Sequence, residues 1–581
     1  MEVSGMRQGI WSGTAALLLC SWMAVSGDCP DTPPADAFTK ESLTTPGLLK
    51  EPIEMSVAKD GRVFVAQRNG AIMLYDPATR ATTLAGTLDT YLYAGQFDVG
   101  GILGVAVSPA FPADNWVYAY YAPKSLWNGK AAQESGKLVQ RLARFRFAGG
   151  KLDLASEQVL FDIPATWQTH NGGSLKFGKD GDLYLSTGDN SCAGCNDQFS
   201  PMDERPGKEY TDDQRSTANT NDLRGKILRI HPEATQAAGR WYTIPKGNLF
   251  ADGTAKTRAE IYTMGHRNPY RIFPDPVTGR LYIGEFGPAA QLATERGPEG
   301  ADQVKITDNA AFLGYPYFLK DNQPYCHWDY GQLKCVPIKG QDGMKYDPLR
   351  PVNTSPNNTG LEVLPPATPA ALWEHDGKSP DPIPGLKACG FGAGAVYHYD
   401  PALASTAKFP PWFEAKLLLF GIGSGWQPKL AIVPPGAVAP LKQAVAAPWT
   451  AKGINFSSGV HDMEYGLGDG ALYVLDYGGS FYAENGDAGL TRITYNGCLP
   501  TVGVAARPET RSGMPPGKRQ LMLTDAAGRT LTVPAGARGA TAWSLAGRRL
   551  WEIRFPAGSQ SELSLPPNLP AGLLRLEWKG L

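Results

Sequence analysis

Residues 170–190 read HNGGSLKFGKDGDLYLSTGDN and contain two short runs in which apolar and polar residues alternate. A period of two is typical of a half-buried strand, and a Gly-rich turn between two such runs predicts a β-hairpin. The turn residues here are Gly178–Gly181 (GKDG). If these residues form a four-residue loop, antiparallel pairing places His170 opposite Asp189. We therefore expect a histidine and a carboxylate to meet at the open end of this hairpin.

A histidine that faces an aspartate is the basic unit of general-base catalysis. The carboxylate fixes which ring nitrogen carries the proton, and it stabilises the cation that forms when the ring accepts a second proton. A purely structural hydrogen bond is the alternative, because polar groups at strand ends need partners. His170 and Asp189 are thus a candidate catalytic pair. The residues around them decide between the catalytic and the structural interpretation.

The alternating pattern recurs along the chain, and no segment shows a sustained helical period. Of the 581 residues, 67 are Gly and 48 are Pro, and both residue types disfavour long helices. Antiparallel units repeated around an axis avoid open sheet edges by closing a ring, as in a β-propeller. The sequence therefore predicts an all-β fold, with a six-bladed β-propeller over residues 27–498. The six predicted units span residues 62–75, 116–147, 174–230, 260–306, 394–433 and 459–495.

The first residues of the chain predict export. Arg7 precedes an apolar stretch, residues 14–25, with small residues at Ala24 and Ser26, which is typical of a signal peptide over residues 1–26. A membrane anchor is the alternative, but about 20 apolar residues are needed to span a bilayer and this stretch is shorter. We expect a secreted or periplasmic protein without a transmembrane span.

The last part of the chain, residues 499–581, begins with a stretch rich in Arg, Gly and Pro and continues with short strands. It predicts a small C-terminal β domain, which is either an accessory or sorting module or a structural cap. Over the whole chain, 55 basic and 56 acidic residues give a net charge of −1, which excludes a strongly basic nucleic-acid binder. A small polar partner is expected, and the sequence leaves the oligomeric state open.

The cysteine spacing predicts disulfides, as expected in an oxidising compartment. One pair forms a CxxC motif without a following His, which argues against haem attachment and favours a local disulfide. The plausible pairs are Cys192 with Cys195, Cys326 with Cys335, and Cys29 with Cys498, which leaves Cys389 over.

Further polar residues follow two predicted strands. Arg267 and Asn268 come after EIYTM, and Gly287 and Pro288 come after LYIGEF. Arg267 offers a fixed positive fork for an oxyanion and Asn268 offers a donor and an acceptor, while the two backbone carbonyls can face a hard cation. A surface ion pair and a simple turn are the respective alternatives. The sequence contains no nucleophile elbow, zinc helix, Walker loop or dinucleotide fingerprint.

At these residues the sequence resembles the glucose/sorbosone dehydrogenase family, soluble six-bladed propellers that use pyrroloquinoline quinone (PQQ) with calcium to oxidise aldoses. The chain looks most like the bacterial sugar dehydrogenase branch with SPxDERPG and NTNDLRGKILRI. The matching stretches, between about residues 51 and 495, are GGILGVAVSPAF, HNGGSLKFGKDGDLYLSTGDN, MDERPGKEYTDDQRSTANTNDLRGKILRIHP, GHRNPYRIFPDPVTGRLYIGEFGP and HDMEYGLGDGALYVLDYG.

The resemblance implies a role for each matching residue. His170 would take the sugar hydroxyl proton while a hydride passes to the quinone, and Asp189 would orient His170. Arg267 would stabilise the developing quinone oxyanion, and an external acceptor would then take the electrons. The implied PQQ contacts are Gln96, His170, Arg267 and Asn268, and the implied calcium ligands are Gly287, Pro288 and Asp302.

Three positions depart from the family pattern. Where relatives carry basic residues that pair with PQQ carboxylates, this chain has Ser424 and Gly459. Losing two charge-assisted hydrogen bonds of roughly 1.5 to 3 kcal/mol each weakens binding by a few orders of magnitude unless they are replaced. Lys429 and His461 are candidate replacements, although neither is in register. Gln96 also lies three residues farther from GILG than the family pattern places its glutamine.

The sequence thus predicts an exported quinoprotein oxidoreductase, a PQQ-dependent sugar dehydrogenase with His170 as general base. The alternative is a non-redox propeller that binds carbohydrate or protein through the same face, with a decayed cofactor pocket. A third interpretation is a hydrolytic calcium propeller such as a lactonase, since a His–Asp pair beside a metal can also activate water. The residues do not identify the sugar or the electron acceptor.

Overall fold

The computed structural model is an all-β protein that separates into two compact units, residues 1–500 and 501–581. Its described residues contain strands and only single turns of 3-10 helix, in agreement with the high Gly and Pro content. Among these residues, no helix is long and apolar enough to cross a membrane. The predicted signal peptide lies outside them. The described residues are 29–30, 32–92, 100–129, 138–165, 167, 169–192, 197–374, 390–422, 429–432, 445–447, 454, 459–480 and 482–499, followed by six strands beyond residue 500.

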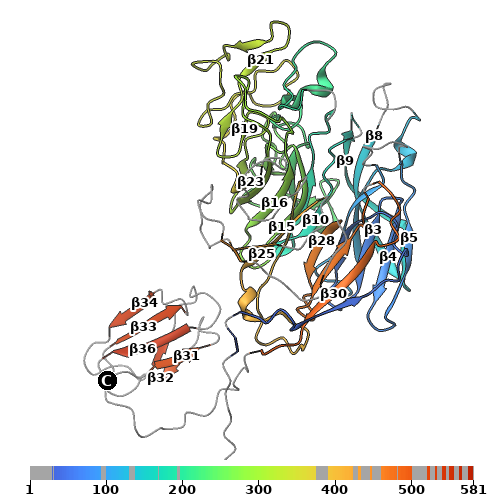
Figure 1. The fold of residues 1–581 in the computed structure, drawn as a ribbon, viewed down its shortest axis with the longest axis vertical. Coiled ribbons are helices and arrows are strands. Elements are labelled where there is room, and N and C mark those ends of the chain that lie inside the picture. Colours follow the sequence, from blue (N-terminus) through green and yellow to red (C-terminus); the bar gives the residue numbers. More distant parts are fainter. Residues whose placement is uncertain are drawn as a thin grey trace, which may run out of the picture. The chain divides into compact units, whose positions relative to one another are not determined.

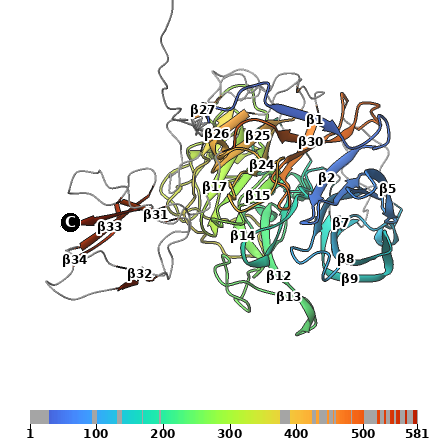
Figure 2. The ribbon, with the colours of Figure 1, turned by 90° about the horizontal axis from the view of Figure 1, so that it is seen from below.

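Five sheets of the first unit are arranged like the blades of a propeller (Figure 1, Figure 2). Strands adjacent in sequence mostly pair antiparallel, because Gly-containing turns connect them directly. One sheet contains β2 (Pro52–Val57), β3 (Val63–Gln67), β4 (Ala71–Asp76) and β5 (Ala81–Thr87). The next contains β6 (Ile102–Val107), β7 (Trp116–Tyr121), β8 (Leu138–Ala148) and β9 (Lys151–Ala165). The third contains β10 (Leu175–Phe177), β11 (Leu183–Thr187), β12 (Lys226–Ala237), β14 (Ile261–Met264) and β18 (Ala311–Phe312), with β13 (Arg240–Thr243) beside β12.

The fourth sheet has eight strands, in which β15 and β24 lie parallel and pair at Arg271 and Gly392. One half contains β15 (Asn268–Pro274), β16 (Leu281–Phe286), β17 (Asp302–Thr307) and β23 (Leu372–Glu374). The other half contains β24 (Phe391–Val396), β25 (Lys416–Gly421), β26 (Lys429–Ile432) and β27 (Val445–Ala447). The fifth sheet contains β28 (Val460–Tyr465), β29 (Leu472–Asp476), β30 (Gly489–Tyr495) and β1 (Phe38–Ser42).

The inner strands of these sheets form a closed ring. β2 contacts β6, β6 contacts β10, β10 contacts β15, β15 contacts β24, β24 contacts β28, and β28 returns to β2. The ring closes through the fifth sheet, where β1 from the start of the chain pairs antiparallel with β30 near the end. A Cys29–Cys498 disulfide joins the same two ends, which confirms that predicted pair.

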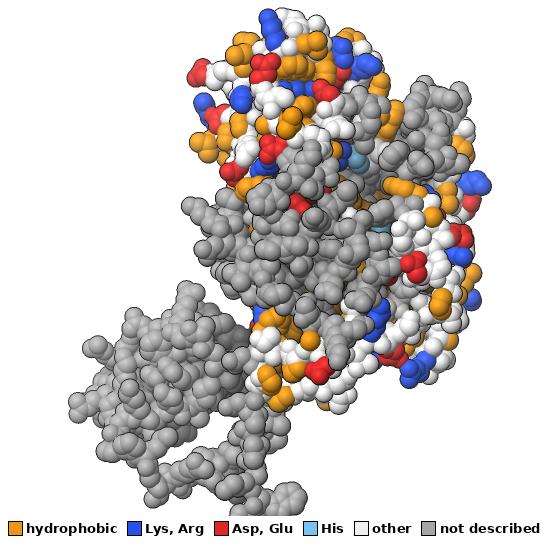
Figure 3. Space-filling view, viewed as in Figure 1, with side chains coloured by type: hydrophobic (Ala, Val, Ile, Leu, Met, Phe, Trp, Pro, Cys, Tyr) orange, Lys and Arg blue, Asp and Glu red, His pale blue; other side chains and the backbone are white. Residues whose placement is uncertain are grey.

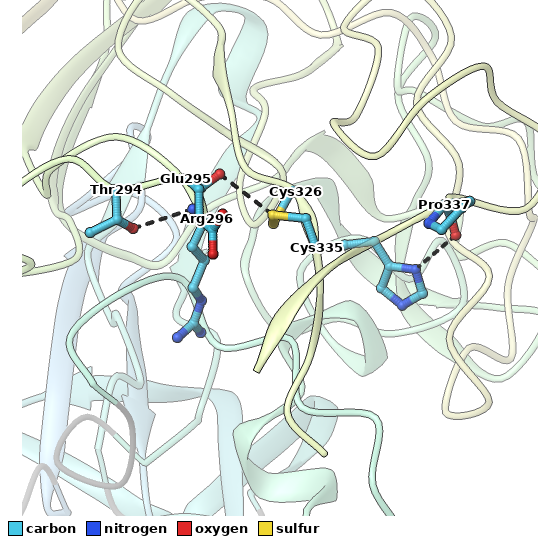
Figure 4. The surroundings of a disulfide bond; sticks show 7 residues. Thr294, Glu295, Arg296, Cys326, Cys335 and Pro337 are labelled. Atoms are coloured by element: carbon cyan, nitrogen blue, oxygen red, sulfur yellow. Dashed lines mark hydrogen bonds between the residues drawn. A yellow bond between two sulfur atoms is a disulfide. The ribbon is translucent and has the colours of Figure 1, made fainter. Parts of the chain in front are cut away.

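The other cysteine predictions have different outcomes. The Cys326–Cys335 disulfide is confirmed, and it links the short hairpin of β21 (His327–Asp329) and β22 (Lys334–Val336), where Cys335 lies against the Glu295 carbonyl (Figure 4). Another short hairpin, β19 (Phe318–Leu319) with β20 (Gln323–Pro324), precedes it. Cys192 is disulfide-bonded. The other three cysteines, Cys20, Cys195 and Cys389, lie outside the described residues.

One predicted repeat unit is wrong. Residues 260–306 do not form one sheet, because β14 pairs with β12 of the preceding sheet, through Lys226 and Met264, whereas β15, β16 and β17 belong to the next sheet. The chain thus adds β14 to the sheet of β10, β11 and β12 before it crosses to β15 of the next sheet. Alternation within a strand cannot show to which sheet that strand belongs.

Charged side chains lie between the inner strands. The Nζ of Lys176, on β10, lies 2.7 Å from Asp462 Oδ2 and 2.5 Å from Glu464 Oε1 on β28. Glu54, on β2, accepts a hydrogen bond of 2.7 Å from Ser174 Oγ, and burial raises the pKa of Glu54 to about 7. These contacts connect three sheets and fix the start of β10, next to the candidate catalytic pair.

The second unit has its own small sheets. Its four-stranded sheet has the order β31 (Gln520–Leu523), β36 (Leu574–Lys579), β33 (Gly539–Ser544) and β34 (Arg549–Arg554). A separate pair joins β32 (Thr530–Thr532) and β35 (Glu562–Ser564).

Candidate functional site

The hairpin of β10 and β11 is shifted by one residue from the predicted register. Leu175 pairs with Leu185, and the predicted four-residue loop is wrong. The Gly178 N–H donates to the Asp182 carbonyl at 2.9 Å, which encloses a turn of three residues with Asp180 in the left-handed region at φ 63°. The turn therefore begins one residue later than predicted and ends at the same residue, Gly181, and every pair along the hairpin moves with it.

His170 nevertheless contacts Asp189. Its backbone partner is Asn190, whose N–H donates to the His170 carbonyl at 3.0 Å. His170 and Asn190 both adopt left-handed backbone conformations, with φ of 54° and 55°, so the alternation of side chains along the strands does not extend to them. His170 Nδ1 lies 2.9 Å from Asp189 Oδ1. Left-handed residues other than Gly are uncommon and concentrate at functional sites.

The environment keeps His170 neutral. Its ring is only 12% exposed, and burial together with the positive charge of Arg267 lowers the pKa of His170 well below its usual value. Asp189 Oδ1 also accepts the Ser191 N–H at 2.9 Å, so this oxygen is an acceptor and the proton of the imidazole belongs on Nδ1. None of the described residues is hydrogen-bonded to Nε2. This nitrogen therefore presents a lone pair that can accept a proton.

Gly188 allows the two strands to approach at this point. An added Cβ at Gly188 would lie 2.1 Å from the His170 carbonyl oxygen and 3.0 Å from Asn268 Oδ1. Any side chain at this position would push these groups apart. The Gly-rich sequence around the hairpin is thus a requirement of the site's geometry.

Arg267 and Asn268 lie beside the pair, as the sequence predicts for a common site. The Asp189 N–H donates to the Arg267 carbonyl at 2.7 Å, and the Gly172 N–H donates to Asn268 Oδ1 at 3.1 Å. The Arg267 backbone N–H in turn donates to Glu285 Oε1. The Arg267 guanidinium is half-buried and has no hydrogen bond to another described residue. It is therefore available for an anionic oxygen next to His170.

Glu285 organises a buried network that sequence reasoning missed. Its Oε2 accepts hydrogen bonds from His266 Nδ1 at 3.1 Å and from Lys305 Nζ at 2.8 Å. Burial and the charge of Lys305 lower the pKa of His266 to about 4, so this ring is neutral at physiological pH. The network fixes the backbone of Arg267. The one sequence signal for this network is that GHRNP, which contains His266, is followed by GEFGP, which contains Glu285.

Asp302 lies where the family resemblance expects a calcium site, and the structure shows a structural role for it. Its Oδ1 accepts the Gly287 N–H at 2.8 Å and its Oδ2 accepts the Gly390 N–H at 2.7 Å. Within the described part of the chain, no three His, Cys, Asp or Glu side chains cluster as metal ligands. The donor set around Gly287 and Pro288 consists of backbone carbonyls, and an added Cβ at Gly300 would lie 1.8 Å from the Pro288 carbonyl oxygen.

The remaining positions at which the family resemblance implies cofactor contacts separate into two groups. Gln96 and Ser424 lie outside the described residues. At Gly459 an added Cβ would lie 2.3 Å from the Gly478 carbonyl oxygen, so an arginine does not fit there without backbone movement. His461 does not replace that cation, because burial lowers its pKa to about 3. The described residues thus fit an anionic acceptor at Arg267, but supply no second cation at position 459.

Asp213 and Tyr315 also belong to the site, although the sequence did not single them out. Both are buried, and Tyr315 Oη donates to Asp213 Oδ2 at 2.5 Å. The carboxyl of Asp213 lies against that of Asp189. Asp213 lies in the stretch TDDQRSTANTNDLRG, which matches the family pattern, but nothing in its spacing shows which of its acids reaches the pair.

A cavity of about 350 Å³ lies at the other end of the inner strands, lined from several hairpin turns. Its lining includes Lys59, Pro109, Gly178, Pro276 and Leu467. Gly178 is at the closed end of the hairpin whose open end carries His170, so this cavity is distinct from the candidate site. On the face drawn in Figure 3, acidic and basic side chains of the described residues are interspersed.

Taken together, the ring of sheets and the His–Asp pair beside an arginine define the class of protein: an all-β, propeller-like protein with a candidate general-base site. The family model of Glucose / Sorbosone dehydrogenase matches residues 49–345, and the chain belongs to this family.

Two curated relatives carry dehydrogenase names. Quinoprotein glucose dehydrogenase B of Acinetobacter calcoaceticus is 23% identical over 337 residues, which cover 55% of this chain and 62% of the relative. Aldose sugar dehydrogenase YliI of Escherichia coli is 24% identical over 236 residues, which cover 40% of this chain and 49% of the relative. The matches thus span about half to three-fifths of these relatives' lengths.

Among solved structures, the chain matches the PQQ-bound form of an aldose sugar dehydrogenase from Streptomyces coelicolor. It is 19% identical, with a TM-score of 0.44, and the match covers 80% of this chain and 99% of that one.

Proposed function

We propose that this protein is an exported oxidoreductase that oxidises a sugar by hydride transfer to PQQ, with His170 as the general base. The observation that carries the proposal is the geometry of His170: its Nδ1 is bonded to buried Asp189, its Nε2 has no described partner, and Arg267 lies beside it. Membership of the Glucose / Sorbosone dehydrogenase family and the names of the relatives support the reaction class. When bound, PQQ would supply a two-electron acceptor for the hydride.

The chain's own residues would supply the proton chemistry. His170 Nε2 would take the proton of a sugar hydroxyl. The hydride would leave the carbon that bears this hydroxyl, so that the C–OH group becomes a carbonyl. Asp189 would hold the imidazole in the required tautomer and stabilise the imidazolium. The Arg267 guanidinium would stabilise negative charge that develops on an oxygen of the acceptor, and Asn268 would hold the cofactor.

PQQ binding is expected to be weaker than where a second arginine is present, because position 459 has no room for one. The same observation favours a second candidate function, a propeller that binds carbohydrate or protein without redox chemistry. A calcium ion remains part of the proposal and would be held by the carbonyls of Gly287 and Pro288, with Asp302 fixing that loop.

Several further expectations belong to this proposal. We interpret the eight-stranded sheet as two blades of four strands, because its halves meet at a single parallel pair, and the propeller then has six blades. Residues 1–26 would be removed on export, and residues 499–581 would form the accessory β domain. An external acceptor would take the electrons in turn.

Reconstitution tests the proposal directly. PQQ and calcium are added to the purified apo-protein, PQQ binding is measured by fluorescence quenching, and dye reduction is followed across a panel of aldoses. The proposal expects binding and dye reduction in the wild type, and binding with greatly reduced turnover in His170→Ala. Absence of both in the wild type would overturn it. Sugar binding without turnover would favour the non-redox propeller, and lactone hydrolysis would favour the hydrolytic one.

A further inference from the structure

Two buried carboxyl groups meet directly behind His170. Asp189 and Asp213 are both 0% exposed, and their carboxyl groups are within hydrogen-bonding reach of each other. Asp189 Oδ2 and Asp213 Oδ1 receive no hydrogen bond from an N–H or O–H group of the described residues. Two ionised carboxylates would leave both oxygens without a donor in a site closed to solvent, and they would also repel each other. A single proton between them satisfies both oxygens.

The neighbours decide which residue carries this proton. Asp189 Oδ1 already accepts two donors, His170 Nδ1–H and Ser191 N–H, and both favour the ionised form of Asp189. Asp213 Oδ2 accepts one donor, the Tyr315 hydroxyl. A protonated Asp213 matches this arrangement at every atom, because its Oδ1–H donates to Asp189 while its Oδ2 remains an acceptor for Tyr315.

The electrostatic surroundings agree with that assignment. Burial raises the pKa of both acids, and the charge of Asp189 raises the pKa of Asp213 further, to well above its usual value. The pKa of Asp189 rises only to about 6, because the positive charge of Arg267 opposes the effect of burial. Arg215 and Arg224 are the other cations whose charges interact with these acids. At neutral pH the pair therefore carries one negative charge, on Asp189.

We propose that Asp213 is a positioning residue that stays protonated at neutral pH and donates its proton to Asp189 Oδ2. Its hydrogen bond completes the set of donors that orient the Asp189 carboxylate toward His170. Its neutrality matters equally, because a second negative charge here would raise the proton affinity of the imidazole and leave less of the free base. The catalytic consequence rests on the proposed function, whereas the shared proton does not.

Asp213→Asn tests the assignment with almost no change of shape. Its amide NH₂ would donate to Asp189 and its amide oxygen would accept from Tyr315, as the protonated acid does. We expect this variant to keep kcat/KM within about threefold of the wild type. Asp213→Ala leaves Asp189 Oδ2 without a donor, and we expect a loss of about 10- to 100-fold. Equal large losses in both variants would overturn the proposal.

Infrared spectroscopy supplies a readout that does not depend on catalysis. At pH 7 the difference spectrum of wild type minus Asp213→Asn should contain the carbonyl stretch of a protonated carboxylic acid. Tyr315→Phe should shift this band to higher frequency, because the acid carbonyl loses its hydrogen bond. This variant also tests the proposal if Asp213→Asn does not fold. Absence of the band, or a band insensitive to Tyr315, overturns the inference; a normal band without sugar oxidation overturns only the proposed function.

The adjacent residue is the matched control. Asp212 is equally buried, but donors surround both of its oxygens: Oδ2 accepts from Ser355 Oγ at 2.6 Å and from Asn357 Nδ2 at 2.9 Å, and Oδ1 accepts from the backbone and side-chain amides of Gln214. In Asp212→Asn the new amide NH₂ would face groups that are themselves hydrogen-bond donors, so we expect a clear drop in Tm. Asp213→Asn should leave Tm near the wild-type value. Equal drops in Tm would contradict the assigned proton.

Discussion

Replacing Lys176 with Met removes the cation from the centre of the inner strands. Its Nζ is bonded to the Met55 carbonyl at 3.0 Å, to Asp462 at 2.7 Å and to Glu464 at 2.5 Å, and its side chain is only 8% exposed. Met fills nearly the same volume, so lost packing contributes little. The buried carboxylates lose their counter-ion, and breaking such a pair costs ~3 to 5 kcal/mol of unfolding free energy.

The loss of stability in Lys176→Met should depend on pH, and the pKa shifts of the neighbouring glutamates decide whether it increases or decreases with pH. Lys176 lowers the pKa of Glu54 and of Glu464, and burial raises both. Without Lys176 the folded-state pKa values rise further above the unfolded value of 4.5, so the ionised forms are disfavoured in the folded protein. The destabilisation by the substitution is therefore smallest where the acids are protonated in both folded proteins. It grows as pH rises past the wild-type folded pKa of Glu54, about 7, and is larger at pH 8 than at pH 5.

Urea unfolding followed by tryptophan fluorescence at pH 5 and pH 8 measures both effects. Lys59→Met, at an exposed lysine, is the control and should change stability by less than about 0.5 kcal/mol. A loss below about 1 kcal/mol for Lys176→Met at pH 8, or a loss equal at both pH values, would refute the reasoning.

Three further predictions concern the candidate site. Asp189→Asn should lower kcat/KM for dye reduction by about 10- to 100-fold, because His170 loses a charge-assisted hydrogen bond; unchanged steady-state kinetics would contradict this. Gly188→Ala should cost about 1 to 3 kcal/mol in urea unfolding, since its Cβ would lie 2.1 Å from the His170 carbonyl oxygen. Gly486→Ala, with no atom within 4 Å of its Cβ, is the control and should change little. Arg267→Ala should raise the pKa of His170 in an NMR titration, because it removes a positive charge that lowers this pKa; an unshifted titration would exclude that contact.

Much of the candidate site could be predicted from local pattern. The hairpin and its Gly-rich turn follow from the alternation of residues 170–190, although the predicted register is wrong by one residue. The error arose because Asp180 adopts a left-handed conformation that the turn sequence permits but does not require. Left-handed conformations at His170 itself then restored the contact.

Other parts of the site were beyond the sequence. Asp213 reaches Asp189 from a separate loop, and its neighbour Asp212 has the same residue type with the opposite hydrogen-bonding role. Residue type and spacing cannot distinguish an acid that must donate from one that must accept, because the answer depends on atoms brought together by the fold. The lack of space at Gly459 likewise depends on a distant strand end.

The sequence by itself predicted that the protein is all-β and that a histidine and an aspartate meet at a hairpin end, and it indicated Cys29–Cys498 and Cys326–Cys335 as plausible disulfides, all of which the structure confirms. These features rest on the alternation of apolar and polar residues, on the residues that favour turns, and on the positions of the cysteines along the chain. All three can be read from the sequence without knowledge of the fold. Only the tertiary structure decided the protonation of the acids behind His170 and the sheet to which each strand belongs. Both depend on burial and on contacts between residues distant in sequence, because desolvation and close approach arise only when the ring of sheets has closed.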